Sequence, residues 1–514
     1  MEFEKNHFDY SLKLIAKSSV FVFLGLFFAK VFAYIYKIII ARYFGPEIYG
    51  LFSLALVILN WFVVFSALGL NQGILRYIPF YRGKNQLYKI KYIFKFAFFF
   101  TFLTSVLAGV FLFFFSETIS TTFFHDEGLV IFLKIFSVVV PLSVLMQLFL
   151  FLILSFEKIK TYTFIHDILQ DCVKVFSLVF LVFIGFKVSA VAFSYASGIL
   201  ISLLFAYFIS KKIFVNLINK RLLREQEKIK ISKEIFNYSW PLLFSGVIFA
   251  LFYWADSFMI GLLMDTQSVG FYNAAVPIAM LLTITSEFFT KLFFPFITRE
   301  YSKNKKNLEL IKQLSKQIGK WIFAINFPLF ILIIIFSEFF IKTFFGDQYL
   351  IAQNPLRILI FGAFFSSIFL ISTQLLSMIG KTKIILMDTL FISIFNIFLN
   401  LILIKRYGIS GAAISTTISL VSLNLLFLIQ AKKYLSIVPL KRKIINIVAV
   451  SIIPTILIIF LKERFKPTSL LEVSLLISFF ILCYLITILT TSCLDKNDLM
   501  ILKSFKNKLS LLKN

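Results

Sequence analysis

Apolar residues run along this chain in long, nearly uncharged stretches separated by short polar connections. Fourteen stretches of about 20 residues are each long enough to cross a hydrocarbon core of about 30 Å as a helix. The pattern therefore predicts an all-α, polytopic membrane protein with fourteen transmembrane helices. The predicted spans are 17–40, 48–70, 92–115, 129–154, 164–184, 188–209, 236–262, 271–297, 320–336, 355–378, 384–404, 408–430, 444–461 and 469–490.

Composition agrees with this pattern, because 60% hydrophobic and only 15% charged residues exclude a set of water-soluble domains. The net charge of +27 raises the question of a nucleic-acid partner. Of the Lys and Arg residues, 38 lie on the termini and alternate connections, against 8 on the intervening ones. This asymmetry follows the positive-inside rule. It predicts a multi-pass protein of the cell (plasma or inner) membrane with both termini in the cytoplasm, and it excludes nucleic-acid binding.

The chain resembles itself at a nearly constant offset. Tyr49–Phe52 is similar to Val269–Tyr272, and Val188–Ser194 is similar to Ile409–Ser415, which gives offsets of 220 and 221. Repeats at matching places in the spans indicate that spans 1–6 and 7–12 are duplicated bundles. Because six crossings preserve orientation, we expect a pseudo-two-fold axis along the membrane normal, with helices 13 and 14 outside the repeat.

These observations set the predicted domain boundaries. Paired parallel bundles are typical of alternating-access transporters. The sequence carries no HExxH or GxSxG motif, and its cysteines show no metal-site spacing, so we expect neither an enzyme nor a cofactor. The predicted parts are an N-terminal lobe (1–210), a cytoplasmic linker (211–235), a C-terminal lobe (236–430), helices 13 and 14 (431–490) and a cytoplasmic tail (491–514).

Charged residues within the spans are the candidate functional residues, since each costs about 2.5–3.5 kcal/mol at mid-membrane. Lys30 and Lys37 lie seven residues apart on one face of span 1. Lys37 can reach the outer surface, whereas Lys30 lies near mid-depth and favours a water-filled cavity. Lys134 and Arg357 lie at equivalent places near the outer ends of spans 4 and 10, where they either reach the surface or line a common outer vestibule.

Acidic residues form a second group of candidates. Asp167, Asp171 and Lys174 are spaced by four and three residues on span 5, which predicts one helical stripe with an internal ion pair. Glu287 and Lys291 form a similar spacing on span 8. A structural pair and a role in ion coupling both remain open for these groups.

Asp256 on span 7 corresponds to Tyr36 in the first repeat, one residue from Lys37. Both positions lie toward the outer surface. We therefore expect Lys37 and Asp256 to pair as a gate when the outer side is closed.

Three strings carry a family resemblance: Ala41–Leu51, Gly69–Pro79 and Asp256–Tyr272. They resemble the polysaccharide-biosynthesis flippases of the multidrug/oligosaccharidyl-lipid/polysaccharide exporter superfamily, and the resemblance covers essentially the whole chain. It implies movement of a polyprenyl-pyrophosphate-linked oligosaccharide from the cytoplasmic to the outer leaflet. Lys30, Lys37 and Arg76 are then the expected pyrophosphate contacts.

Other partners and functions follow less directly. A coupling ion, H⁺ or Na⁺, is the driving force that the family implies, and the basic linker 211–235 is suited to anionic lipid headgroups. A cation-coupled multidrug exporter of the same superfamily is the main alternative. A membrane glycan polymerase or ligase is a further alternative, although the longest predicted outward loop, 337–354, is short for such an enzyme.

Overall fold

The computed structural model describes residues 2–215, 224–303, 308–467, 469–491 and 493, with side chains described from Lys30 onward apart from a few positions. Every regular element in these ranges is helical. This confirms the predicted all-α membrane fold, in which each backbone amide is satisfied within its own helix, as hydrocarbon requires. The tail 494–514 and the linker residues 216–223 lie outside the described residues.

Ten helices of the described chain are long and apolar enough to cross a membrane, or eleven when the bent pair α9 and α10 counts as one span. Fourteen spans stay a prediction. The count of ten or eleven is lower than fourteen for two reasons. The helices α1 and α14 each contain two predicted spans, joined at Gly45 (φ 82°) and at Gly408 (φ 56°). The predicted span 164–184 is divided between a π-helix and the short α6. Both glycines adopt left-handed backbone angles that other residues rarely reach.

The helices follow one another with short connections. Their bounds are α1 (Glu2–Ser66), α2 (Leu70–Gly83), α3 (Leu87–Thr118), η1 (Ile119–Phe123), α4 (Gly128–Ser155), α5 (Ile159–Thr163), η2 (Phe164–Leu169), α6 (Gln170–Phe183), α7 (Ser189–Val215), α8 (Glu225–Leu263), α9 (Thr266–Ala279), α10 (Leu281–Lys303), α11 (Leu308–Ile335), α12 (Ser337–Phe344), η4 (Asp347–Ala352), α13 (Gln353–Met378), α14 (Thr382–Leu435), α15 (Lys443–Phe465) and α16 (Leu470–Thr490).

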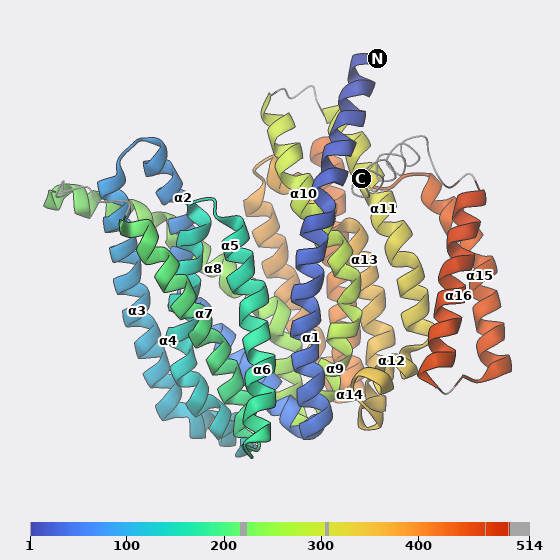
Figure 1. The fold of residues 1–514 in the computed structure, drawn as a ribbon, viewed down its shortest axis with the longest axis horizontal. Coiled ribbons are helices and arrows are strands. Elements are labelled where there is room, and N and C mark those ends of the chain that lie inside the picture. Colours follow the sequence, from blue (N-terminus) through green and yellow to red (C-terminus); the bar gives the residue numbers. More distant parts are fainter. Residues whose placement is uncertain (1, 216–223, 304–307, 468, 492, 494–514) are drawn as a thin grey trace, which may run out of the picture. The chain divides into compact units, whose positions relative to one another are not determined.

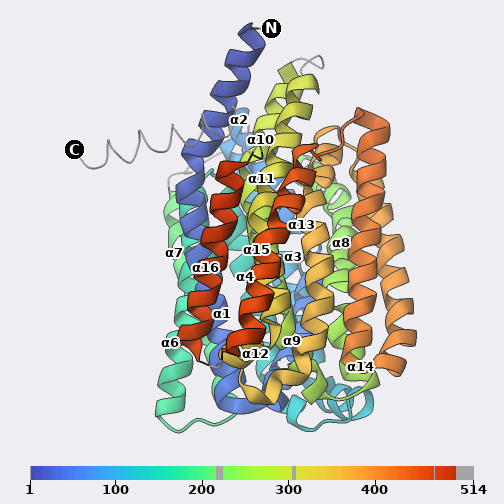
Figure 2. The same ribbon diagram turned by 90° about the vertical axis from the view of Figure 1, so that its right-hand side faces the viewer.

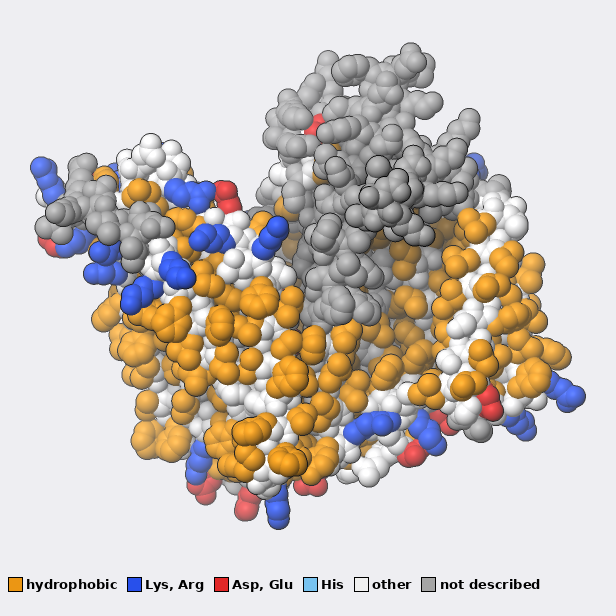
Figure 3. Space-filling model, in the orientation of Figure 1, with side chains coloured by type: hydrophobic (Ala, Val, Ile, Leu, Met, Phe, Trp, Pro, Cys, Tyr) orange, Lys and Arg blue, Asp and Glu red, His pale blue; other side chains and the backbone are white. Residues whose placement is uncertain are grey.

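Two compact units make up the chain. Unit 2 consists of residues 27–274 and 393–412. Within it, α4 packs between α3 and α7, and α6 packs on α7 (Figure 1). The rings of the buried residues Phe52, Phe132 and Phe136 and of the half-buried Tyr195 form an aromatic cluster that ties α1, α4 and α7 together. On the face shown in Figure 3, hydrophobic side chains cover these helices, and Lys and Arg gather toward the end that carries α2.

Unit 1 consists of residues 1–26, 275–392 and 413–514. Its α10 packs on α11 and α13, and α15 and α16 lie side by side (Figure 2). Buried side chains of α11, α15 and α16, among them Leu332, Ile458 and Phe480, form one cluster. Lys462 of α15 also donates a hydrogen bond to the carbonyl oxygen of Ile335, at the end of α11. The last two helices are thereby attached to α11.

A close helix crossing in unit 2 joins Gly50 of α1 to Gly270 of α9. A Cβ atom added to Gly50 would lie 2.9 Å from the Gly270 nitrogen and would overlap the carbonyl oxygen of Thr266. A Cβ added to Gly270 would lie 3.1 Å from the Gly50 nitrogen and would overlap the carbonyl oxygen of Pro46. The contact is therefore reciprocal between positions that correspond in the predicted repeat, as a two-fold axis requires. The lobe boundaries at 210, 235 and 430 themselves stay predictions.

We expect Gly50→Ala to destabilise the protein by about 1–3 kcal/mol, because the new methyl group has no room at a crossing made of backbone. Thermal unfolding in detergent, followed by intrinsic fluorescence, measures the effect. Gly83→Ala is the matched control, since nothing lies within 4 Å of the position of its new Cβ. Equal melting temperatures for the two variants would show that the crossing tolerates a side chain.

Candidate functional site

The main candidate site is an ion pair on α6 within unit 2. Nζ of Lys174 lies 3.1 Å from Oδ1 of Asp171, and Lys174 is only 7% exposed. The ring of Tyr195 on α7 lies under this ammonium group, 4.4 Å from Nζ to the ring centroid. The spacing of three residues predicts this pair, and the structure contains it. An aromatic face and a carboxylate together stabilise the buried cation.

A glycine on α7 makes room for the lysine. The position of a Cβ on Gly198 lies 2.5 Å from Cγ of Lys174 and 3.0 Å from the carbonyl oxygen of Gln170. Any larger residue would therefore displace the Lys174 side chain. Glycine is needed at position 198 because the Lys174 side chain and the backbone of α6 approach it closely, and not because its backbone angles are unusual.

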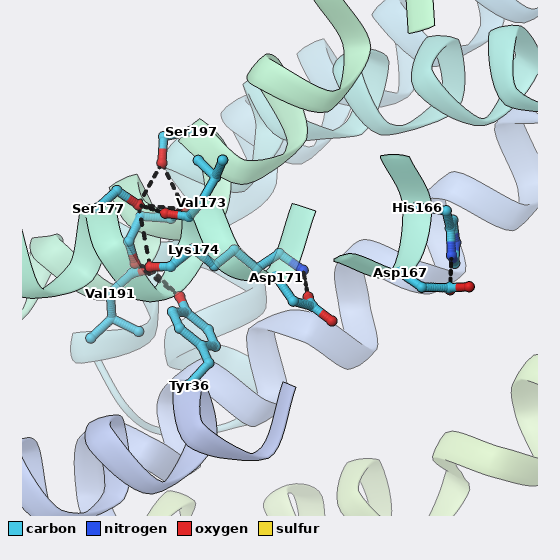
Figure 4. Close-up of polar contacts among 10 residues, drawn as sticks. Tyr36, His166, Asp167, Asp171, Val173, Lys174, Ser177, Val191 and Ser197 are labelled. Atoms are coloured by element: carbon cyan, nitrogen blue, oxygen red, sulfur yellow. Dashed lines mark hydrogen bonds and ion pairs between the residues drawn. The ribbon is translucent and has the colours of Figure 1, made fainter. Parts of the chain in front are cut away.

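Hydrogen bonds fix α1 against α7 beside this pair (Figure 4). The hydroxyl of Tyr36 donates to the carbonyl oxygen of Val191 at 3.0 Å and lies 2.9 Å from Oγ of Ser194. Lys37, the next residue, interacts electrostatically with Lys30, Asp171 and Lys174. The structure thus brings together the predicted lysines of span 1 and the predicted ion pair of span 5.

Asp167 lies one turn before Asp171, on the π-helix η2. Its Oδ1 is 2.6 Å from Nδ1 of His166, and the Tyr162 ring stacks on the imidazole with 5.4 Å between ring centroids (Figure 4 for the His166–Asp167 pair). Asp167 therefore pairs with its neighbouring histidine, while Asp171 pairs with Lys174. The predicted stripe holds two separate pairs.

Asp256 lies in a second polar cluster of unit 2. Its carboxylate accepts hydrogen bonds from the Tyr272 hydroxyl and from Nδ2 of Asn400, each at 2.8 Å. The same Asn400 nitrogen lies 3.1 Å from Oδ1 of Asn396. These contacts hold a 6% exposed carboxylate in a fixed position. The predicted gate between Asp256 and Lys37 stays a prediction.

The remaining basic candidates are spread over the chain. Arg76 on α2 is exposed and lies over the ring of Tyr238, 4.2 Å from the guanidinium carbon to the ring centroid. Lys134 on α4 is exposed. Arg357 on α13, in unit 1, is half-buried and donates through Nε to Oγ of Ser337 at 2.8 Å. The shared outer vestibule predicted for Lys134 and Arg357 stays a prediction.

Glu287 lies half-buried on α10. The side chain of Lys291, its predicted partner, lies outside the described residues. A pair at this position therefore stays a prediction.

Several residues of these clusters were not among the predicted site residues. Tyr195, Gly198 and His166 lie beside the ion pairs of unit 2, and Asn400 binds Asp256 from 144 residues away. A histidine next to an aspartate inside an apolar span was a usable signal for His166. The contacts of Tyr195, Gly198 and Asn400 depend on helix packing and leave no local pattern.

Comparison with known proteins places the chain in a family. The model of a family described as "Polysaccharide biosynthesis protein" matches residues 15–301, more than half of the chain. The chain belongs to the polysaccharide biosynthesis protein family. A second model, MatE, matches residues 241–402 of this family member.

Curated relatives of this polysaccharide biosynthesis family member come from bacteria and archaea. The chain is 22% identical over 390 residues to a putative O-antigen transporter of Shigella flexneri, covering 74% of this chain and 89% of that protein. It is 26% identical over 195 residues to Agl15, a probable low-salt glycan biosynthesis flippase of Haloferax volcanii. That match covers 38% of this chain and 41% of Agl15. It is 25% identical over 460 residues to an uncharacterised membrane protein of Methanocaldococcus jannaschii, covering 86% and 88%.

Solved structures share the fold of this family member. The lipid II flippase MurJ in an inward closed conformation superposes with a TM-score of 0.69 at 17% identity, covering 91% of this chain and 98% of that one. An inward-facing multidrug resistance MATE transporter gives a TM-score of 0.66 at 13% identity, covering 79% and 94%. The likeness shows that this family member has the fold of these two membrane proteins.

The buried ion pair generates a stability prediction. We expect Asp171→Asn to destabilise the protein by about 3 kcal/mol, because it leaves the Lys174 ammonium group buried without its counter-charge. Adding Lys174→Met to this variant removes that charge and should restore most of the lost stability. Thermal unfolding of the wild type, both single variants and the double variant forms a double-mutant cycle. Additive losses in the double variant would contradict a coupled pair.

Proposed function

We propose that this protein is an alternating-access flippase that moves a polyprenyl-pyrophosphate-linked oligosaccharide from the cytoplasmic to the outer leaflet of the cell membrane, for surface polysaccharide or glycoprotein assembly. The observation that carries the proposal is the basic cluster of unit 2. Lys37 interacts electrostatically with Lys30, Asp171 and Lys174, and Lys174 pairs with Asp171, so ammonium groups outnumber carboxylates among these four residues of the membrane-spanning helices. Such charge is costly in lipid unless an anionic group shares the site.

The chemistry of the proposed substrate fits this cluster. A pyrophosphate carries several negative charges, and ammonium groups bind phosphate oxygens through charge-assisted hydrogen bonds. The glycan needs a polar environment, while the polyprenyl tail is able to remain in lipid. The family match and the names of the Shigella and Haloferax relatives support a lipid-linked glycan as the substrate class.

Other charged residues have proposed places along the same route. Arg76 contacts the pyrophosphate at the cytoplasmic entrance, and Lys134 and Arg357 contact it near the outer surface. Asp256 and Glu287 are proposed for gating or ion coupling. Both termini lie in the cytoplasm in this proposal, and the basic connections bind anionic headgroups.

A cation-coupled multidrug exporter is the second candidate, because the MatE model matches residues 241–402 and includes Asp256. A buried carboxylate in a membrane protein is suited to a cationic drug or ion. The excess of lysine around Asp171 favours an anionic substrate instead. The two candidates therefore differ in the sign of the charge that the protein moves.

We expect Lys37→Ala to lower the initial rate of transport about ten-fold or more, since one charge-assisted hydrogen bond contributes about 1.5–3 kcal/mol. Transport is measured as leaflet-to-leaflet movement of a polyprenyl-pyrophosphate oligosaccharide in sealed vesicles that contain the purified protein. Lys30→Ala tests the second lysine in the same way.

Lys187→Ala is the matched control for that experiment, because Lys187 is an exposed lysine on a connection outside the helices. It should transport at the wild-type rate. Vesicles that do not move the lipid but export a cationic dye along a sodium or proton gradient would transfer the assignment to the drug-exporter branch.

A further inference from the structure

Two cations of unit 1 converge on the residues where α11 ends and α12 begins, Ile335, Phe336 and Ser337, hereafter the α11–α12 corner. Lys462 of α15 donates a hydrogen bond from Nζ to the carbonyl oxygen of Ile335 at 2.5 Å. Arg357 of α13 donates from Nε to Oγ of Ser337 at 2.8 Å. Because Ile335 and Ser337 are two residues apart, at most about 7 Å separates their Cα atoms. The packing of α13 and α15 on this corner therefore brings two positive charges to one place.

Each of these cations has more hydrogen-bond donors than it uses at the corner. An ammonium group has three N–H donors, and a guanidinium group has five. Lys462 uses one of them on Ile335, and its Nζ lies 5.4 Å from the centroid of the Phe336 ring. Arg357 uses Nε, so both of its Nη groups remain as donors. The corner thus holds several N–H groups that have no protein acceptor among the described residues.

The two charges are not neutralised at short range by the protein. Among the described residues, no carboxylate oxygen lies within 4 Å of the nitrogens of Arg357 or Lys462. Glu338 and Glu463 attract Lys462 over longer distances, and Arg357 repels it. Both of these glutamates are exposed. Because like charges at one corner repel each other, an anion that contacts both of them is favoured there.

The place of the corner along the chain matches the level of lipid headgroups. Arg357 is the third residue of predicted span 355–378, and Lys462 directly follows predicted span 444–461. In unit 1, α12 and the connection between α15 and α16 lie at the same end (Figures 1 and 2). Lys462 also lines an open groove of about 470 Å³, which leaves space for the rest of a headgroup. Basic pockets between membrane helices bind the phosphates of such headgroups.

We propose that Arg357 and Lys462 together bind the phosphate of a lipid headgroup at the α11–α12 corner. The planar guanidinium group offers paired N–H donors that match two oxygens of one phosphate, and the ammonium group adds a compact charge. One source of the phosphate is the pyrophosphate of the proposed substrate, in which case the inference rests on the proposed function. The other source is a phospholipid of the bilayer. In both cases the anion links α13 and α15 at the end of α11.

The test measures the affinity of two probes, farnesyl pyrophosphate and phosphatidylglycerol, by native mass spectrometry of the full-length protein in a maltoside detergent, which carries no phosphate. Lys37→Ala serves as the background, because it weakens the proposed pyrophosphate site of unit 2 and leaves the corner unchanged. We expect Arg357→Gln and Lys462→Gln each to lower the affinity for at least one probe about five-fold or more. Glutamine keeps a donor for the corner and removes the charge.

Lys342→Gln is the matched control. Lys342 is exposed on α12, at the same end of unit 1, and its ammonium group pairs with Asp347 at 2.8 Å. This variant removes the same charge but no donor of the corner, so both affinities should stay unchanged. Lys462→Arg keeps the positive charge and should retain binding. Melting temperatures without a probe identify a variant that does not fold, and Arg357→Gln then decides in place of Lys462→Gln.

The outcomes separate the site from the proposed function. Affinities of Arg357→Gln and Lys462→Gln that equal that of Lys342→Gln for both probes would overturn the phosphate site. Binding that is present in the wild type but absent from the Lys37→Ala background would also overturn it, and the proposed function would stand. A loss confined to phosphatidylglycerol assigns the site to a bilayer phospholipid. A loss confined to farnesyl pyrophosphate assigns it to the proposed substrate. Corner binding in a protein that moves no lipid across vesicles would overturn the proposed function alone.

Discussion

Helices inside a hydrocarbon layer gain little from burying apolar surface against each other, and this constraint governs the whole structure. Close packing of small residues and polar contacts must hold the bundle together instead. Gly198 illustrates both, because it lets α7 approach α6 and leaves room for a buried lysine. Tyr36 has a comparable role, since its hydroxyl ties α1 to the backbone of α7.

The charges of unit 2 follow from the same constraint. A buried ammonium group is tolerated where a carboxylate and an aromatic ring surround it, as Asp171 and Tyr195 surround Lys174. Lys37 brings further positive charge to this place. The structural pair and the proposed binding cluster are therefore one feature. The stabilising contact also fixes the geometry with which the lysines are proposed to bind a phosphate.

Much of the fold could be predicted from the sequence because span length and charge asymmetry are local properties. The Asp171–Lys174 pair was predictable for a similar reason, since residues three apart on a helix are neighbours. Contacts between distant residues, such as Asn400 with Asp256, were not. The π-helix that carries His166 and Asp167 also left no pattern in the apolar spacing.

The reciprocal contact of Gly50 and Gly270 has an evolutionary consequence. In a half-length chain that forms a symmetric dimer, the corresponding glycine would lie on the two-fold axis and meet its own copy. Fusion of two such genes preserves that interface, so the fused chain needs no new contact surface between its halves. Both copies must then keep glycine, because the two backbones touch at this position. The Gly50–Gly270 contact is therefore the kind of interface that fusion of two copies of a shorter chain leaves in a single long chain.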